Sequence, residues 1–217
     1  METEQNNLLQ KTFFWMFLGL LGTAIIAYYT YSSGLFAKII LGNFFEVLLI
    51  LEVIVVLLFS FLFRKLPPTV VAILYFVYAA INGVTMSCIF AVFELSSIGL
   101  VFVAAAALFG GLAFYGYKTQ DDLSSWQKPL FGVLIVGLIL SIINIFLGNS
   151  MLDIILDWVV LFVFFGITIY DMNRIKLLAD NPDLPTDKLH IYGAMELYLD
   201  FINIFLRILS LFGKRKN

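Results

Sequence analysis

Long apolar runs without any charge alternate with short charged segments along the whole chain. Four such runs, of 26, 28, 23 and 24 residues, are 12–37, 66–93, 95–117 and 129–152. Each exceeds the ~20 residues that a helix needs to cross the hydrocarbon core of a bilayer. Three more segments are long enough to cross but contain charged side chains: 39–63, 154–177 and 189–212. The pattern predicts an all-α integral membrane protein, a bundle of seven transmembrane helices.

Short connections join these segments, so the sequence predicts a single transmembrane domain over residues 1–217 without a soluble domain. The first run is too long for the apolar core of a cleaved signal peptide. Pro67 and Pro68 mark the turn after the second span, because proline does not continue a helix. The spans are predicted at about 12–31, 39–63, 69–93, 96–117, 129–148, 154–177 and 189–212.

Lysine and arginine concentrate in alternate loops. The second, fourth and sixth loops hold seven of these residues, whereas the first, third and fifth hold one. Positive residues are enriched on the cytoplasmic side, so we expect a multi-pass protein of the cell (plasma) membrane with a cytoplasmic N-terminus. Seven full spans would place Lys214, Arg215 and Lys216 outside, whereas a last helix that re-enters the membrane would leave them inside.

Composition agrees with the membrane assignment. The chain is 62% hydrophobic and 13% charged, with a mean hydropathy of +1.00, which excludes an ordinary soluble globule. Its net charge of −2 gives no basic surface for nucleic acid. A single cysteine, Cys88, and a single histidine, His190, cannot form an internal disulfide or a metal cluster by themselves.

Two aspartates interrupt the last two apolar segments. Asp171 lies in FFGITIYDMNRIKLL and Asp200 in AMELYLDFINIFLRIL. A charge at the centre of a bilayer costs at least ~2.5 kcal/mol, so an intramembrane carboxylate indicates a functional site that faces the protein interior.

The last segment carries a polar stripe. Residues at positions i, i+4, i+7 and i+11 share one helix face, and here they are Glu196, Asp200, Asn203 and Arg207. We expect this face to point inward and the opposite face to meet lipid: Leu199, Phe201, Ile202 and Phe205. The alternative is a helix that lies in the membrane interface with its charges in water. A weaker uncharged stripe in the third span is typical of hydrogen bonds between helices: Tyr78, Asn82 and Thr85.

Three charged residues are predicted at one depth, near the cytoplasmic side: Asp171, Asp200 and Arg64. One arginine neutralises one carboxylate, so the second carboxylate has to take a proton or bind a cation. Two neighbouring carboxylates titrate as a coupled pair, so their shared charge can respond to pH as in a pH sensor. Carboxylate oxygens are also ligands that calcium prefers. Glu52 lies about 18 Å from Arg64 along the second span. It is either a second acidic station of an ion pathway, together with Glu196 and Asn203, or a hydrogen-bonding partner of a neighbouring helix.

Several sequence words resemble the Bax inhibitor-1 family, also called the transmembrane Bax inhibitor motif family, and in particular its bacterial members. They are FGITIYDMNRIK around Asp171, LYLDFINIFLRIL around Asp200, and YGYKTQDDLS from Tyr115 to Ser124. Weaker similarities are LLILEVIVV, INGVTMS and SIINIFLGNSMLD. Together they cover the chain from the second span to its end.

The resemblance implies a bundle whose C-terminal helix is central and wrapped by the other six. It also implies a proton-sensitive calcium leak, gated by Asp171 and Asp200, with Arg64 as a latch and Glu52 as the pore acid. The partners would be calcium ions, protons and the lipid bilayer. No cofactor is expected beyond calcium as the transported or bound ion. The sequence FLFRKLPP departs from the longer basic cluster that relatives often have near the arginine.

Three other functions share some of these sequence features. Intramembrane aspartyl proteases also place aspartates on adjacent helices, but Asp200 has no preceding glycine and no Pro-Ala-Leu motif follows it. We therefore expect no enzyme. A non-transporting membrane regulator that binds other membrane proteins fits the family, although no segment specifies a partner surface. A proton-coupled solute carrier would favour paired helices broken by glycine or proline, and this pattern is missing.

Overall fold

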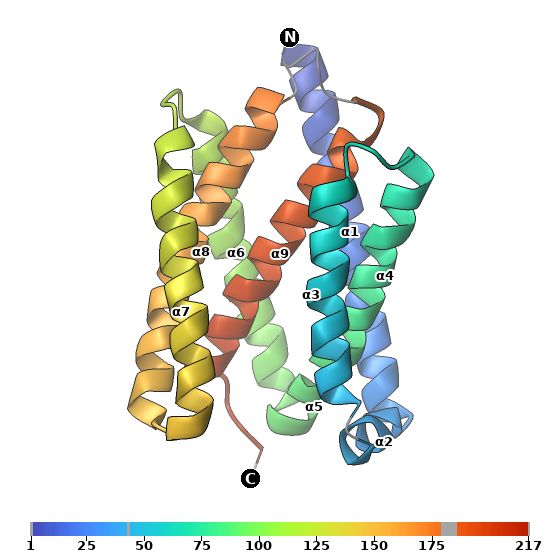
Figure 1. Cartoon of the computed structure of the whole chain (residues 1–217), viewed down its shortest axis with the longest axis vertical. Helices are drawn as coiled ribbons and strands as arrows, with labels where there is room; N and C mark the ends of the chain where they lie inside the picture. Colours follow the sequence, from blue (N-terminus) through green and yellow to red (C-terminus); the bar gives the residue numbers. More distant parts are fainter. Residues whose placement is uncertain (1, 43, 179–185, 217) are drawn as a thin grey trace. The chain divides into compact units, whose positions relative to one another are not determined.

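The computed structural model describes residues 2–42, 44–178 and 186–216, and they are helical for most of their length (Figure 1). The helices of this described part are α1 Glu2–Ser32, α2 Leu35–Leu41, α3 Phe45–Leu62, α4 Pro68–Met86, α5 Cys88–Val92, α6 Leu95–Lys118, the 3-10 helix η1 Ser124–Trp126, α7 Gln127–Leu147, α8 Ser150–Leu178 and α9 Thr186–Phe212.

The chain divides into two compact units. Unit 1 comprises Met1–Glu94, Leu178–Tyr198 and Arg215–Asn217, and unit 2 comprises Leu95–Leu177 and Leu199–Lys214. Helix α9 therefore contributes its first part to unit 1 and its second part, which begins one residue before Asp200, to unit 2.

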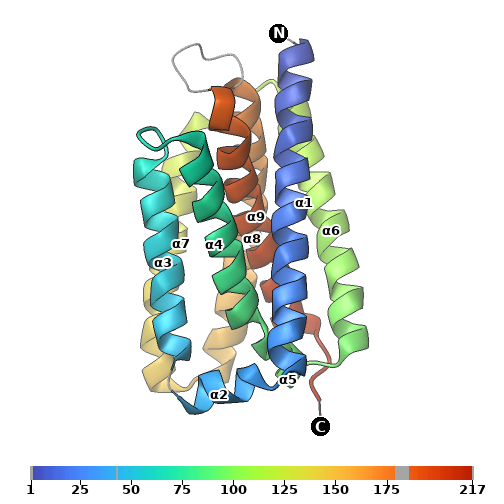
Figure 2. The same cartoon turned by 90° about the vertical axis from the view of Figure 1, so that its right-hand side faces the viewer.

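In unit 1, helices α1 and α3 pack against α4 (Figure 2). Helix α4 begins at Pro68, where the missing N–H of proline leaves no bond unmade. Two glycines let α1 and α4 approach closely, as small residues do between membrane helices. A Cβ on Gly19 would collide with the side chain of Tyr75, and a Cβ on Gly83 would collide with Thr23 and Ile26.

In unit 2, helix α8 packs against both α6 and α7. A Cβ on Gly116 of α6 would collide with the backbone of Ile169, and a Cβ on Gly166 of α8 would meet Leu130 of α7. The second part of α9 packs on α6 through aromatic rings, because Phe201 lies 5.3 Å from Phe102, centroid to centroid.

Six helical segments of the described residues are long and apolar enough to cross a membrane. They are Gln5–Ser32, Phe45–Leu62, Pro68–Val92, Leu95–Lys118, Ser124–Leu147 and Ser150–Leu178. The all-helical, multi-pass architecture predicted from the sequence is thereby confirmed. Helix α9 is not among the six, because polar and charged residues interrupt it. The seventh predicted span, 189–212, and its central position stay predictions.

The second span is shorter than predicted. It begins at Phe45 rather than at residue 39, because the preceding residues form the separate helix α2, which ends at Leu41 with Gly42 as its C-cap. Gly34, with φ at 76°, turns the chain between α1 and α2 in a conformation that favours glycine. Helix α2 buries none of its residues within the structure.

The prediction that one face of the last segment meets lipid is wrong for three of its four residues. Phe201, Ile202 and Phe205 are 3%, 5% and 3% exposed. The reason is the packing on α6, where the ring of Phe102 contacts both phenylalanines. Asp200, on the polar face, is 2% exposed, which contradicts the alternative of a helix with its charges in water.

Candidate functional site

The two aspartates singled out by the sequence are both buried in unit 2. Asp171 lies in α8 and is 5% exposed, and Asp200 lies in α9 and is 2% exposed. One turn before Asp171, the hydroxyl of Thr168 donates to the backbone oxygen of Phe164 (2.8 Å), so this polar side chain is satisfied within its own helix. Both carboxylates therefore lie inside the protein, as an intramembrane site requires, and their pairing stays a prediction.

Arg64, the predicted latch, lies in the turn between α3 and α4 with an exposed side chain. A buried cation from another helix contacts this turn: Lys188 of α9, which is 4% exposed. Its Nζ donates to the backbone oxygens of Arg64 (3.2 Å) and Leu66 (2.5 Å). In the sequence, Lys188 is one of the positive charges counted in the sixth loop, and no pattern marks it further. Arg64 is a residue of unit 1, whereas Asp171 and Asp200 are residues of unit 2. The pairing of Arg64 with either aspartate stays a prediction.

Glu52 of α3 is held by two side chains of α4. The hydroxyl of Thr85 donates to Glu52 Oε1 at 2.5 Å, and Nδ2 of Asn82 donates to the same oxygen at 3.4 Å. The hydrogen bonds between helices that the third-span stripe predicted are confirmed for Asn82 and Thr85. Of the two functions left open for Glu52, bonding to a neighbouring helix is present, and its place in an ion pathway stays a prediction.

The same polar cluster continues from α4 to α9 and α1. The hydroxyl of Tyr198 donates to Asn82 Oδ1 (2.9 Å) and lies 2.7 Å from the hydroxyl of Thr23. The backbone oxygen of Ala79, 3.0 Å from the Thr23 hydroxyl, is the alternative acceptor for its single hydrogen. Four helices of unit 1 thus meet in one hydrogen-bonded chain, which we call the Glu52 chain: Thr23, Tyr198, Asn82, Thr85 and Glu52.

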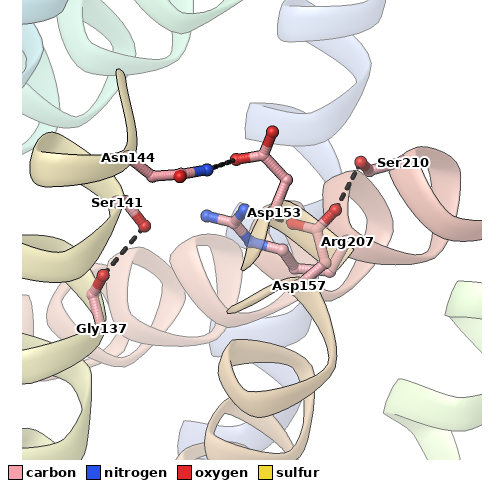
Figure 3. A network of polar contacts seen from close by, with 7 residues as sticks. All are labelled: Gly137, Ser141, Asn144, Asp153, Asp157, Arg207 and Ser210. Atoms are coloured by element: carbon pink, nitrogen blue, oxygen red, sulfur yellow. Dashed lines mark hydrogen bonds and ion pairs between the residues drawn. The ribbon is translucent and has the colours of Figure 1, made fainter. Parts of the chain in front are cut away.

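A third buried carboxylate of unit 2, that of Asp157 in α8, is held by a positive charge (Figure 3). Nη1 of Arg207 donates to Asp157 Oδ1 at 2.6 Å, and the hydroxyl of Ser210 donates to Oδ2 at 2.5 Å. The polar stripe predicted an inward-facing Arg207, but its partner Asp157 was not predicted. The available signal was an acidic residue inside an apolar segment, the same signal that identified Asp171.

Asn144 closes the turn between α7 and α8 beside this ion pair (Figure 3). Its Nδ2 donates to Asp153 Oδ1 (2.5 Å) and to the backbone oxygen of Asn149 (2.9 Å). Asn144 is 2% exposed, so these bonds satisfy a buried amide, and they fix the end of α7 against the start of α8.

The remaining predicted pathway residues, Glu196 and Asn203, are half-buried in α9. Nδ2 of Asn203 donates to the backbone oxygen of Leu199 in the same helix (2.8 Å). In the described part of the chain, no group of three or more His, Cys, Asp or Glu residues could hold a metal ion. A calcium ion at Asp171 and Asp200 would therefore need oxygens from outside these residue types.

Comparison with known proteins agrees with the sequence words. The family model described as "Inhibitor of apoptosis-promoting Bax1" matches residues 5–217. The inner membrane protein YbhL of Escherichia coli (strain K12) is 36% identical over 208 residues, covering 93% of this chain and 89% of that protein. A protein of Borreliella burgdorferi is 32% identical over 98% of this chain and 94% of its own length. The chain belongs to the Bax inhibitor-1 family of membrane proteins.

Proposed function

We propose that the protein is a pH-sensitive calcium leak channel or transporter of the cell membrane, gated by Asp171 and Asp200. The observation that carries the proposal is the burial of both carboxylates in unit 2 of a multi-pass membrane protein. Membership of the Bax inhibitor-1 family supports it. Buried acids on membrane helices mark ion and proton pathways more often than they stabilise a fold.

The mechanism follows from charge balance. When both carboxylates are ionised, the pair attracts a cation, which is calcium or the guanidinium of Arg64 in the latched state. A shared proton removes part of that charge, so the attraction for arginine weakens and the closed and open populations shift. Proton and calcium thus compete for the same negative charge.

A crossing by α9 is part of the proposal, and contacts in unit 1 support it. Near the start of α9, Lys188 binds carbonyls just before α4. After the end of α9, Lys216 binds the carbonyl oxygens of Phe90 (2.7 Å, from Nζ) and Val92 (2.8 Å, from the backbone N) in α5. The two ends of α9 thus contact opposite ends of the α4–α5 segment, which fits a seventh span. Such a span would place the C-terminal lysines on the other side of the membrane from the cytoplasmic N-terminus.

Calcium flux into dye-loaded proteoliposomes, measured at several pH values, tests the proposal. Asp171→Asn and Asp200→Asn keep the shape of the side chain but cannot titrate, so each is expected to flatten the dependence of flux on pH. Asp153→Asn is the matched control, because it removes an exposed carboxylate from the same helix α8 as Asp171.

Two results would overturn the proposal. Flux that follows pH in either folded Asn variant as it does in wild type would remove the aspartates as the sensor. An absence of flux in the wild-type protein would favour a non-transporting regulator of other membrane proteins. Loss of cleavage of a transmembrane reporter in Asp200→Ala would instead indicate a protease, and we expect no such cleavage.

A further inference from the structure

The hydrogen atoms of the Glu52 chain point in one direction. At 2.5 Å from Oε1, the single hydroxyl hydrogen of Thr85 goes to the carboxylate, which can only accept when it is ionised. Asn82 offers Glu52 an N–H through Nδ2, and its Oδ1 accepts from Tyr198. Because the phenol has one hydrogen and gives it to Asn82, its contact with Thr23 needs the hydrogen of the Thr23 hydroxyl, which then does not go to the backbone oxygen of Ala79.

Tyr198 decides which way the Asn82 amide faces. In the opposite orientation the amide oxygen would lie against the Glu52 carboxylate, and two acceptors would repel each other. The hydroxyl of Tyr198 donates to Oδ1 and so favours the orientation that offers Nδ2 to Glu52. Tyr198 and Asn82 are 0% and 6% exposed, so water does not replace these bonds.

No basic side chain contacts Glu52 in the described part of the chain. Its hydrogen-bonding partners are neutral, Thr85 and Asn82. The titratable groups within electrostatic range come from three elements: Tyr78 of α4, Cys88 of α5 and Tyr198 of α9. The negative charge of Glu52 therefore depends on hydrogen bonds from neutral donors, and the residue that orients the Asn82 donor, Tyr198, lies on α9.

We propose that Tyr198 is a positioning residue that holds the Asn82 amide toward Glu52 and thereby couples the protonation state of Glu52 to helix α9, two residues before Asp200. The proposal rests on the pH-sensitive function above and adds a second proton-responsive site to it. When Glu52 takes a proton, its oxygens become weaker acceptors, so the bonds from Asn82 and Thr85 weaken. The change reaches α9 through the amide that Tyr198 orients.

The test compares Tyr198→Phe with Tyr75→Phe. Both remove one phenol hydroxyl from a fully buried tyrosine of unit 1, but the hydroxyl of Tyr75 donates to the backbone oxygen of Trp15 (2.9 Å), outside the Glu52 chain. The readout is the infrared band of the protonated Glu52 carboxyl, assigned by its loss in Glu52→Gln. Tyr198→Phe is expected to move the titration midpoint of this band to higher pH by about 0.5 unit, because the carboxylate loses an oriented donor. Tyr75→Phe is expected to leave it unchanged.

Equal midpoints in Tyr198→Phe and wild type would overturn the positioning role. If Tyr198→Phe does not fold, the isosteric Thr23→Val removes the donor to Tyr198 and is expected to give a smaller shift in the same direction; an unshifted midpoint there has the same meaning. Calcium flux separates the two proposals. A shifted band in a wild-type-like protein without any flux leaves the positioning role standing and overturns only the calcium function, whereas a shifted band with an unchanged flux-versus-pH curve overturns the coupling to α9.

Discussion

Two acidic side chains that bond to neighbouring helices, Glu52 in unit 1 and Asp157 in unit 2, are held in opposite ways. In unit 1 the carboxylate of Glu52 accepts hydrogen bonds from neutral donors, the hydroxyl of Thr85 and the amide of Asn82. In unit 2 the carboxylate of Asp157 accepts from a guanidinium and a hydroxyl, of Arg207 and Ser210. The first acid carries a charge that only dipoles stabilise, and the second carries a charge that an ion balances.

This difference separates a proton-responsive site from a structural one. A proton on Asp157 would leave the guanidinium of Arg207 without its counter-charge. A carboxylate among neutral donors loses less when it takes a proton, so Glu52 can change state without leaving a cation unpaired. Glu52 is therefore a second place where pH can act.

The largest expected effect comes from breaking the ion pair. Arg207→Met leaves the carboxylate of Asp157 without a cation, and one missing partner of a buried pair costs about 3–5 kcal/mol. The Arg207 side chain is 34% exposed, so we expect a loss at or below the lower end, about 2–3 kcal/mol, in the free energy of unfolding. Denaturant unfolding in detergent micelles measures it.

The double variant Asp157→Leu/Arg207→Met is the control for this prediction. It removes both charges, so it is expected to recover most of the lost stability. A single Arg207→Met variant as stable as wild type would show that water, not Arg207, balances the charge of Asp157.

Buried lysines give the next effect, of similar size in both units. Lys188 in unit 1 binds two backbone oxygens, of Arg64 and Leu66, and Lys176 in unit 2 binds those of Tyr117 (3.0 Å) and Thr119 (2.7 Å). Either change, Lys188→Met or Lys176→Met, leaves these carbonyls without their charged donor, at about 1–3 kcal/mol in the free energy of unfolding.

The matched control for the lysines is Lys118→Met. Lys118 is exposed at the end of α6, where its Nζ lies 5.8 Å from the ring centroid of Phe114. We expect a change below about 0.5 kcal/mol, as for other surface positions. Losses as small as this in both Lys188→Met and Lys176→Met would contradict the role of the two lysines as charged donors to these backbone oxygens.

The sequence predicted the helices better than their partners. Length and apolarity locate each of the six spans, because a helix in lipid satisfies its backbone within itself. The stripe of Asn82 and Thr85 also predicted bonds between helices. The ion pair of Asp157 and Arg207 could not be predicted, because 50 residues separate the two and no spacing rule relates different helices. The burial of Phe201 depends on Phe102 of α6 for the same reason.

A smaller effect is expected at Glu52 itself. Glu52→Gln keeps an oxygen that accepts from Thr85 and Asn82, and it leaves no cation unpaired. We therefore expect the free energy of unfolding at neutral pH to change by less than about 1 kcal/mol, less than in Arg207→Met. A loss as large as that of Arg207→Met would show that Glu52 has a charged partner and would remove the contrast between the units.

The smallest effect lies in the exposed loop between α6 and η1 in unit 2. The backbone N–H of Ser124 donates to Asp122 Oδ1 (2.9 Å), and this bond, with a further one from the Ser124 side chain, lowers the pKa of the Asp122 carboxyl from its ordinary value of 3.8. Because the pKa is lowered in the folded state, the ionised carboxylate stabilises the loop above pH 3.8. This contribution is lost as the pH falls through the lowered pKa. The amide proton resonance of Ser124 is expected to follow that titration, and Asp122→Ala to abolish it.

Asp121→Ala removes the same charge from the same loop without touching the Ser124 contact, so it is the matched control. A Ser124 resonance that titrates equally in Asp122→Ala would assign the bond to another acceptor. Unlike Glu52 and Asp157, the Asp122 carboxylate lies in water. Its hydrogen bond therefore orders a turn and does not neutralise a charge inside the membrane.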